Sequence, residues 1–423
     1  MMDRLAIEGG AKAVQQKLPG AFSAAGRTFG EEEEAFVLAA LRSGCLSRNG
    51  GTMVPRLEQE FAAAIGVKHA VACSSGTACV HLAIAALDLE PGDEVIVPPI
   101  TDIGSILPVL WQNAIPVFAD VDPLTMVLDP ASVEANITER TKAVVAVHLA
   151  GNCCEMDALV AICRRHGIVL IEDASQAYWA EYKGKRAGSM GDMACFSLQQ
   201  SKHITCGEGG LMVTSNADYA RRALLFSDKA WPRDSGTLGS CRFLFLSQNY
   251  RMSELNGAVA LAQLRKVEGI VARRRERAEQ LIHELEGVEG VAAPWTSAEV
   301  KHSYWLFMLR ITASEIDTQA FGDALVAEGV SAWVRYIVDP LYLSPIFTEP
   351  RTYGHSGYPL TQYGRQVYQR GLCPESEKAL ARVIAIQWNE NYSEDQVRQI
   401  ATAIRKVASH FHSVATGRTT TGI

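Results

Sequence analysis

The sequence predicts an α/β fold in which a large domain with a mixed, mostly parallel sheet precedes a smaller α+β domain. Two observations predict the large domain: apolar strand-like runs recur between about residues 67 and 215, and helical segments separate several of them. Strands that are apolar almost throughout are typical of a sheet covered by helices on both faces. A third observation predicts the second domain, because after Asn249 long helical segments dominate over a stretch the size of a small domain.

The elements of the large domain follow in order along the chain. Residues 1–30 are irregular, and residues 31–43 are predicted to form a helix, because acidic residues begin it and Gly44 follows it. Strands are predicted at residues 69–73, 93–98, 115–121, 142–149, 167–173, 192–198 and 209–215. Helices are predicted between several of them, at residues 78–87, 103–112, 130–135 and 155–166. No helix separates the last two strands, so the sheet is expected to be mixed.

The C-terminal part is predicted to alternate helices with a few strands. Helices are predicted at residues 252–286, 314–328, 363–371 and 394–410, and strands at residues 304–311 and 330–334. We divide the chain into an N-terminal segment (1–30), a large domain (31–265), a small domain (266–412) and a tail (413–423). The tail consists mainly of small and polar residues, so it is expected to be disordered.

The composition excludes several classes of protein. The chain has 423 residues and a net charge of −7, and this mixed, acidic balance is not that of a protein that binds nucleic acid or an anionic membrane. No apolar run approaches the roughly 20 residues that span a bilayer, and the first ten residues do not resemble a secretory signal. A cytoplasmic location is therefore expected. None of the ten cysteines has C-x-x-C spacing, so buried, reduced thiols are expected and no metal site is predicted.

Two residues in the middle of the chain carry the candidate chemistry. Asp173 ends an apolar strand, which is where open α/β sheets place ligand-binding groups. Lys202 follows another strand and precedes a glycine-rich turn, where a buried lysine with a lowered pKa is the usual Schiff-base nucleophile toward carbonyls. A lysine in an exposed loop is the alternative interpretation of Lys202 taken alone.

A third feature is the run SSGTA at residues 74–78, between a strand and a helix. Small residues at such a turn leave backbone N–H groups and the positive helix end free for a phosphate, although an ordinary helix cap gives the same pattern. A phosphate cradle, a strand-end carboxylate and a Schiff-base lysine on one sheet are together what pyridoxal 5′-phosphate requires. We therefore predict that cofactor.

The sequence resembles the DegT/DnrJ/EryC1/StrS family of pyridoxal-phosphate-dependent sugar and cyclitol aminotransferases, which have fold type I. The motifs that carry the resemblance, in the family's order, are SGTA (75–78), EDASQA (172–177), GSMGD (188–192), FSLQQSK (196–202), GEGG (207–210) and NYRMSELNGA (249–258). Similarity continues in DPLY (339–342) and CPESEKA (373–379), so it covers nearly the whole chain.

The resemblance implies a role for each matching residue. Lys202 is expected to bind the cofactor aldehyde and Asp173 to pair with the pyridine nitrogen, and both are the predicted catalytic residues. Gln176 is expected against the ring face or its 3-hydroxyl. The phosphate is expected to contact Ser197 and the backbone of Gly76, Thr77 and Ala78. Asn249 is expected to reach the phosphate of a neighbouring subunit, because family members are homodimers that share their sites. Ordinary strand-end polar groups (Gln176, Ser197) and a helix cap (Asn249) remain the alternatives.

The chain departs from the family at two positions. Asp102 stands where most relatives carry an aromatic residue that stacks on the cofactor, so either another side chain covers the ring or this carboxylate faces the substrate. Trp179 stands where relatives usually carry glycine, and it either narrows the substrate pocket or fills the core. His148 and Asn152 at a strand end are further pocket candidates with a structural role as the alternative. Arg335 and Tyr336 either touch the substrate or pack within the small domain.

The expected activity is amino transfer from L-glutamate or L-glutamine to a ketone on a cyclitol, carbocycle or sugar, in antibiotic or other secondary-metabolite biosynthesis. The opening LAIEGGAKAV and the length above 400 residues resemble the branch that acts on free cyclitols and carbocycles. The alternatives are a nucleotide-sugar aminotransferase and a non-catalytic binding or regulatory protein. A sugar dehydratase is disfavoured, because such relatives carry histidine in place of Lys202.

Overall fold

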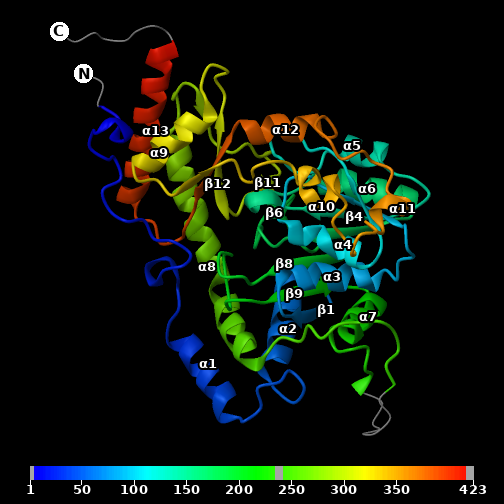
Figure 1. The fold of residues 1–423 in the computed structure, drawn as a ribbon. Coiled ribbons are helices and arrows are strands. Elements are labelled where there is room, and N and C mark those ends of the chain that lie inside the picture. The colour runs from blue at the N-terminus through cyan, green and yellow to red at the C-terminus, as the bar shows by residue number, and fades with distance from the viewer. Residues whose placement is uncertain (1–3, 234–241, 416–423) are drawn as a thin grey trace, which may run out of the picture.

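The structure, a computed structural model that describes residues 4–233 and 242–415, is built on a seven-stranded sheet (Figure 1). Its strands lie in the order β1-β9-β8-β5-β4-β2-β3. Their bounds are β1 His69–Cys73, β2 Glu94–Val97, β3 Ile115–Phe118, β4 Thr141–Val147, β5 Val169–Asp173, β8 Met193–Ser197 and β9 Gly210–Thr214. The five strands from β8 to β3 are parallel, whereas β9 is antiparallel to both β8 and β1. The prediction of a mixed, mostly parallel sheet is therefore confirmed.

Helices cover this sheet and bury its apolar strands. They are α1 Glu31–Arg42, α2 Met53–Ile65, α3 Gly76–Ala86, α4 Leu107–Trp111, α5 Pro130–Ala135, α6 Met156–His166 and α7 Ala217–Ser227. The helix predicted at residues 103–112 is divided into a 3₁₀ turn, Ile103–Ser105, and α4. Pro108 explains the division, because proline has no N–H to donate to the carbonyl four residues earlier, at Gly104, and it suits the first turn of a helix.

A second, four-stranded sheet forms the other core. Its antiparallel strands lie in the order β10-β12-β14-β13, with bounds β10 Val291–Ala292, β12 Leu306–Ile311, β13 Ala332–Val334 and β14 Val383–Gln387. Helices α9 (Thr318–Ala327) and α13 (Glu394–Ala415) lie beside it, together with the upper end of the long helix α8 (Figure 1). The shorter elements lie outside this sheet. Strands β6 Glu181–Tyr182, β7 Lys185–Arg186 and β11 Val300–Lys301 form a small sheet of their own, in the order β11-β6-β7. Helices α10 Pro345–Thr348, α11 Leu360–Tyr363 and α12 Pro374–Ala381 pack against the core of the large sheet.

Helix α8 (Glu254–Glu284) joins the two sheets. It begins where Ser253 Oγ accepts a hydrogen bond from the Asn256 N–H, and it runs without a break to Glu284. It packs against α1 and α2 near the large sheet and against α13 near the small one (Figure 1). Because α8 crosses residue 265 as one helix, the domain division at that residue stays a prediction.

Two predictions for the C-terminal part need correction. The helix predicted at residues 363–371 is wrong, because α11 ends at Tyr363 and an irregular segment follows. Gly364 adopts an extended conformation there, and the Gln366 side chain pairs with the backbone N–H and C=O of Phe118, 2.8 Å for each bond. The predicted tail begins too early, since α13 continues to Ala415, and its remaining residues, 416–423, lie outside the described residues.

Three further findings concern whole-chain properties. In the ranges 4–233 and 242–415, no helix combines the length and apolar character needed to cross a membrane. Within the same ranges, no group of three or more His, Cys, Asp or Glu side chains is placed to hold a metal ion. Nine cysteines are described as free thiols, of which Cys45 is half-buried and the others are buried, while Cys241 lies outside the described residues.

Candidate active site

A cavity of about 380 Å³ lies where the strands β5 and β8 end and α3 begins. Six of the eight predicted site residues line it: Gly76, Thr77, Asp173, Gln176, Ser197 and Lys202. A larger hollow of about 600 Å³, between α2, β1 and α7, contains none of them. The chemistry of the lining residues therefore identifies the site better than volume does.

Lys202 is buried in the loop after β8, with 8% of its surface exposed. Its N–H donates to the Gln199 carbonyl (2.9 Å), and its own carbonyl accepts from Arg27 Nη1 (2.8 Å). The amine Nζ lies 3.9 Å from the centre of the Trp305 ring. Burial lowers the pKa of Lys202 from the ordinary 10.5 to about 8, an effect that the carboxylates of Asp173 and Asp102 partly oppose.

Asp173 occupies the end of β5, and both of its carboxylate oxygens are anchored. Ser105 Oγ donates to Oδ2 (2.7 Å) and the Ser175 N–H donates to Oδ1 (3.1 Å). Ser105 also pairs with Thr101 Oγ1 at 2.9 Å. Since each carboxylate oxygen offers about two acceptor sites, the buried group retains capacity to accept from a protonated ring nitrogen.

The first turn of α3 approaches the end of β8 closely enough to form a cradle. A Cβ added at Gly76 would lie 2.6 Å from Ser197 Cβ and 2.8 Å from its Oγ, so only glycine fits there. Ser75 Oγ accepts from the Ala78 N–H (3.0 Å), and Ala78 does not line the cavity. The first N–H groups of a helix lack partners within the helix, so Gly76 and Thr77 present the positive end of α3 to the cavity.

Gln176 connects two parts of the molecule. Its Oε1 accepts from the Ala150 N–H (2.9 Å), and its Nε2 donates to the hydroxyl of Tyr336 (2.9 Å). Gln176 follows β5 and Tyr336 follows β13, so this bond joins the loop after a strand of the large sheet to the loop after a strand of the second sheet. Arg335, its neighbour, instead donates to the carbonyl of Val338 within its own loop (3.1 Å).

The structure distinguishes the alternatives at two of the unusual positions. Trp179 is buried beside Tyr178 with their rings stacked at 6.3 Å, and the Arg186 guanidinium lies 4.7 Å from the centre of its ring. It does not line the cavity, so Trp179 fills the core. Asp102 does line the cavity, where its Oδ1 accepts from the Gly104 N–H (2.8 Å).

The strand-end candidates His148 and Asn152 have structural partners. His148 is fully buried, and its Nε2 lies 2.9 Å from Glu172 Oε2. Because its Nδ1 accepts from the Cys154 N–H (3.2 Å), Nε2 carries the proton and donates to Glu172. Asn152 Nδ2 donates to the Trp295 carbonyl (3.1 Å). Neither residue lines the cavity.

Asn249 lies away from the cavity of its own chain. It is exposed and forms an isolated β-bridge with Asp228, whose carboxylate accepts from Arg251 and Arg233. Within one chain, the structure therefore does not bring Asn249 to the other predicted residues.

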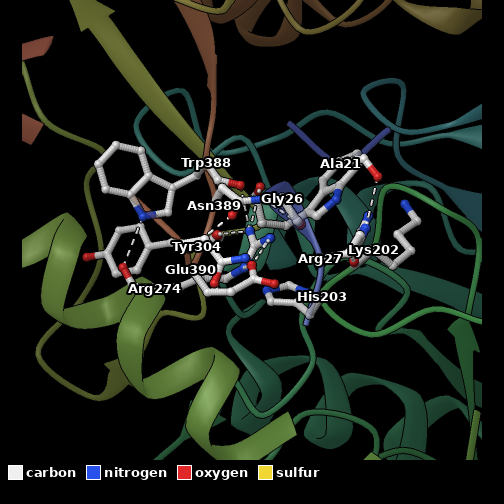
Figure 2. A network of polar contacts seen from close by, with 12 residues as sticks. Ala21, Gly26, Arg27, Lys202, His203, Arg274, Tyr304, Trp388, Asn389 and Glu390 are labelled. Carbon is white, nitrogen blue, oxygen red and sulfur yellow. Dashed lines mark hydrogen bonds and ion pairs between the residues drawn. The ribbon is translucent and has the colours of Figure 1, made fainter. Parts of the chain in front are cut away.

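A buried polar network lies beside the loop that carries Lys202 (Figure 2). Arg274 of α8 pairs with Glu390 at 2.7 Å, with about 1% of either side chain exposed, and also donates to the carbonyls of Trp388 (2.9 Å) and Tyr304 (3.1 Å). Arg27 donates through Nε to the carbonyl of Ala21 (2.9 Å). Figure 2 shows the amine of Lys202 pointing away from His203 and Arg274.

Several lining or supporting residues were not predicted. Ser105, Glu208 and Trp305 line the cavity, and Arg27 braces the backbone of Lys202. A signal existed for Ser105, which follows β2, because the carboxyl ends of parallel strands meet at one edge of a sheet. No comparable signal marks Trp305, which immediately precedes β12 of the second sheet.

The residues present fit pyridoxal 5′-phosphate. The cavity brings together a buried amine, an anchored carboxylate and a helix N-terminus that a single added Cβ would obstruct. These are the three groups that the aldehyde, the ring nitrogen and the phosphate of that cofactor need.

Comparison with known proteins agrees with this chemistry. The chain is 37% identical over 340 residues to GDP-perosamine synthase from Caulobacter vibrioides, covering 79% of this chain and 89% of that protein. It is 36% identical over 378 residues to L-glutamine:2-deoxy-scyllo-inosose aminotransferase from Streptomyces paromomycinus, covering 86% of this chain and 88% of that protein. The crystal structure of 3-amino-5-hydroxybenzoic acid synthase superimposes with a TM-score of 0.81 at 30% identity, covering 90% of this chain and 97% of the other.

The family model of the DegT/DnrJ/EryC1/StrS aminotransferases matches residues 27–405. These relatives are fold type I, pyridoxal-phosphate-dependent aminotransferases of sugars and cyclitols, so the predicted fold type, enzyme class and cofactor are confirmed. The chain belongs to the DegT/DnrJ/EryC1/StrS aminotransferase family.

Proposed function

We propose that this aminotransferase moves an amino group from L-glutamate or L-glutamine to a ketone on a cyclitol or related carbocycle, in the biosynthesis of an antibiotic or other secondary metabolite. The observation that carries the reaction is the buried amine of Lys202, which faces a cavity that Asp173 also lines. When bound, pyridoxal phosphate supplies an aldehyde that takes up the amino group and a ring that draws electrons from the reacting carbon.

Each residue is assigned one task. Asp173 holds a proton at the ring nitrogen, since Ser105 and Ser175 keep its carboxylate oriented. Nζ of Lys202 would take the proton from the donor carbon that bears the amino group and deliver it to the cofactor carbon that receives the group. On the acceptor side, Nζ would move a proton in the reverse direction, from that cofactor carbon to the acceptor carbon. Because the pKa of Lys202 is lowered to about 8, roughly a tenth of this amine is neutral at pH 7.

The remaining predicted residues are assigned to binding. Gly76, Thr77 and Ser197 hold the phosphate at the first turn of α3, and Gln176 orients the ring from its bridge to Tyr336. The N–H of Ala78 is already bonded to Ser75, so Ala78 is proposed to shape the turn rather than to donate.

The charge of the cavity supports a free cyclitol or carbocycle as the acceptor. The lining residues include the carboxylates of Asp102, Asp173 and Glu208, and Lys202 is the one cationic side chain among the described residues that line the cavity. Asp173 is assigned to the cofactor, so Asp102 and Glu208 are the carboxylates left to accept hydrogen bonds from the hydroxyl groups of a polyhydroxylated ring. The similarity to the inosose aminotransferase points in the same direction.

A nucleotide-sugar acceptor is the second candidate. It is favoured by the identity of 37% to GDP-perosamine synthase. The two candidates differ in whether the acceptor carries a diphosphate, which a direct assay resolves.

We also propose that two chains form a dimer in which Asn249 reaches the phosphate of the partner's site. The support is local: Asn249 is exposed, and Phe243, Leu244 and Leu246 in the same segment are 60%, 55% and 93% exposed. Such a run of exposed apolar side chains is typical of a surface that another protein chain covers. The cytoplasm is the proposed location, because free cysteines persist in reducing compartments.

The test begins with the cofactor-loaded protein and each amino donor. L-glutamine or L-glutamate is expected to convert the cofactor to its amine form, which absorbs at shorter wavelength. A panel of inososes, dehydroshikimate-type acids and keto-sugar nucleotides then reveals which acceptor restores the original spectrum. The Lys202→Ala variant is the matched control and should lack the visible band of the lysine-bound cofactor. If neither donor changes the spectrum, a non-catalytic protein is the better explanation.

A further inference from the structure

Trp305 presents the face of its indole to the amine of Lys202. The residue immediately precedes β12 of the four-stranded sheet, yet it lines the same cavity as Asp173 and Lys202. Nζ of Lys202 lies 3.9 Å from the centre of the ring, well inside the roughly 6 Å range of a cation–π interaction. The aromatic wall of the cavity therefore comes from Trp305, while position 102 contributes a carboxylate.

The indole is held in this orientation by three contacts. Its Nε1 donates to the carbonyl of Ser201 (2.8 Å), next to Lys202 in the chain. Its backbone N–H donates to the carbonyl of Ala150 (2.9 Å). The ring of Tyr336 packs against it edge to face, with centroids 6.3 Å apart and planes at 76°. Tyr336 is itself bonded to Gln176, so the indole of Trp305 cannot turn away from Lys202 without losing its bond to Ser201 and its contact with the Tyr336 ring.

The face of an indole attracts an ammonium group much more strongly than a neutral amine. Trp305 therefore favours the protonated form of Lys202, in opposition to burial. The carboxylates of Asp173 and Asp102 act in the same direction as Trp305. Two further groups adjoin Lys202: Arg27 binds its carbonyl oxygen, and burial lowers the pKa of His203 well below its ordinary value, so that this imidazole is neutral.

We propose that Trp305 is a positioning residue for Lys202: its indole face fixes where the amine lies and sets the pH at which the amine gives up its proton. The proposal rests on the assignment of Lys202 as the reacting amine. It concerns a property of the protein without cofactor or substrate, so it can be measured separately from amino transfer.

The experiment measures the pH dependence of amine labelling at Lys202 in the full-length protein freed of cofactor. Limiting acetic anhydride is added across a pH series, and mass spectrometry compares the Lys202 peptide with that of exposed Lys301. The variants are Trp305→Leu, which removes the aromatic face, and Trp305→Phe, which keeps one. Trp333→Leu is the matched control, because it removes an exposed indole from β13 of the same four-stranded sheet, and Trp333 does not line the cavity.

Trp305→Leu is expected to lower the midpoint of labelling by about one pH unit, and Trp305→Phe by less than half of that. Trp333→Leu should leave the midpoint where it is. The direction of the shift is decisive. If Trp305 served merely to exclude water, Trp305→Leu would admit water and raise the midpoint toward the ordinary value of 10.5, and that result, or no shift, would overturn the proposal.

Two safeguards keep the test interpretable. Near-ultraviolet circular dichroism and the melting temperature show whether each variant is folded. If Trp305→Leu is unfolded, the proposal is tested by Trp305→Phe alone, whose labelling midpoint should still shift downward. A shifted midpoint in a protein that fails to transaminate refutes the proposed function and leaves this inference standing. Transamination combined with an unmoved midpoint refutes this inference alone.

Discussion

Gly76→Ala tests whether the first turn of α3 holds the cofactor phosphate. The added Cβ would lie 2.6 Å from Ser197 Cβ, about 1 Å closer than the 3.5–4.0 Å at which carbon atoms pack. Gly76 does not require the left-handed backbone region, so the substitution acts through this contact and not through backbone strain. Either the helix end or Ser197 must move by about 1 Å, and both are proposed phosphate ligands.

The expected effect follows from the cost of overpacking. Inserting a methyl group into a well-packed site typically costs about 1–3 kcal/mol. If that cost falls on the bound state, the affinity for pyridoxal phosphate drops by about 5- to 150-fold. The assay is titration of the cofactor-free protein with pyridoxal phosphate, followed by absorbance, together with a melting curve of the same sample.

Gly269→Ala is the matched control. Gly269 is exposed on α8, and a Cβ there would meet nothing closer than Arg273 Nη1 at 3.6 Å. That variant should bind the cofactor normally and be slightly more stable, since alanine suits a helix interior better than glycine. Unchanged affinity in Gly76→Ala would falsify the assignment of the phosphate to this turn.

Three other predictions concern charge. Lys202→Met should raise the free energy of unfolding of the cofactor-free protein by up to about 3 kcal/mol at pH 7. The reason is that the pKa of the Lys202 amine is 10.5 in the unfolded chain and about 8 in the folded one, so holding the charged amine in the fold is costly. This gain in stability should shrink as the pH rises from 8 to 10.5, because the amine of the folded wild type is then neutral and its burial no longer costs free energy. Urea unfolding at several pH values measures the difference between variant and wild type. A difference that grows with pH would contradict the lowered pKa. Asp173→Asn should lower kcat by about 100-fold or more while the melting temperature stays near that of the wild type, as expected for loss of one preorganised charge, and near-normal turnover would remove Asp173 from the mechanism. Glu390→Gln should destabilise the fold by about 3–5 kcal/mol, because it leaves the buried Arg274 charge without its partner, whereas a melting temperature equal to that of the wild type would mean that the carbonyls around Arg274 suffice.

Prediction from sequence worked best where a pattern is local. The seven strands of the large sheet were found because each is a short apolar run, and the antiparallel β9 was indicated by the missing helix before it. The structure places Lys202 and Asp173 at one cavity, because Asp173 ends β5 and Lys202 follows β8, the neighbouring strand. Helix α2 was overlooked although Val54, Leu57 and Phe61 lie at helical spacing and are fully buried, so its signal was available.

Contacts between distant segments explain what the sequence could not reveal. Trp305 follows Lys202 by about a hundred residues and immediately precedes β12 of the other sheet, so no spacing rule relates the two. The segment after Tyr363 has helix-forming residues, but Gln366 bonds to the backbone of β3 instead of continuing a helix. In both cases the decisive partner is far away in the chain, where propensity carries no information.

The brace formed by Arg27 has a practical consequence for anyone who trims this chain. Its guanidinium links Lys202 to the carbonyl of Ala21, and Gln200 Nε2 donates to that same carbonyl (2.8 Å). The matched family region begins at residue 27. An expression boundary chosen by homology would therefore keep Arg27 and remove the carbonyl oxygen of Ala21, which orients its guanidinium. A truncated enzyme with weak cofactor retention would then reflect the choice of boundary, and residues 20–26 should be kept in any shortened version.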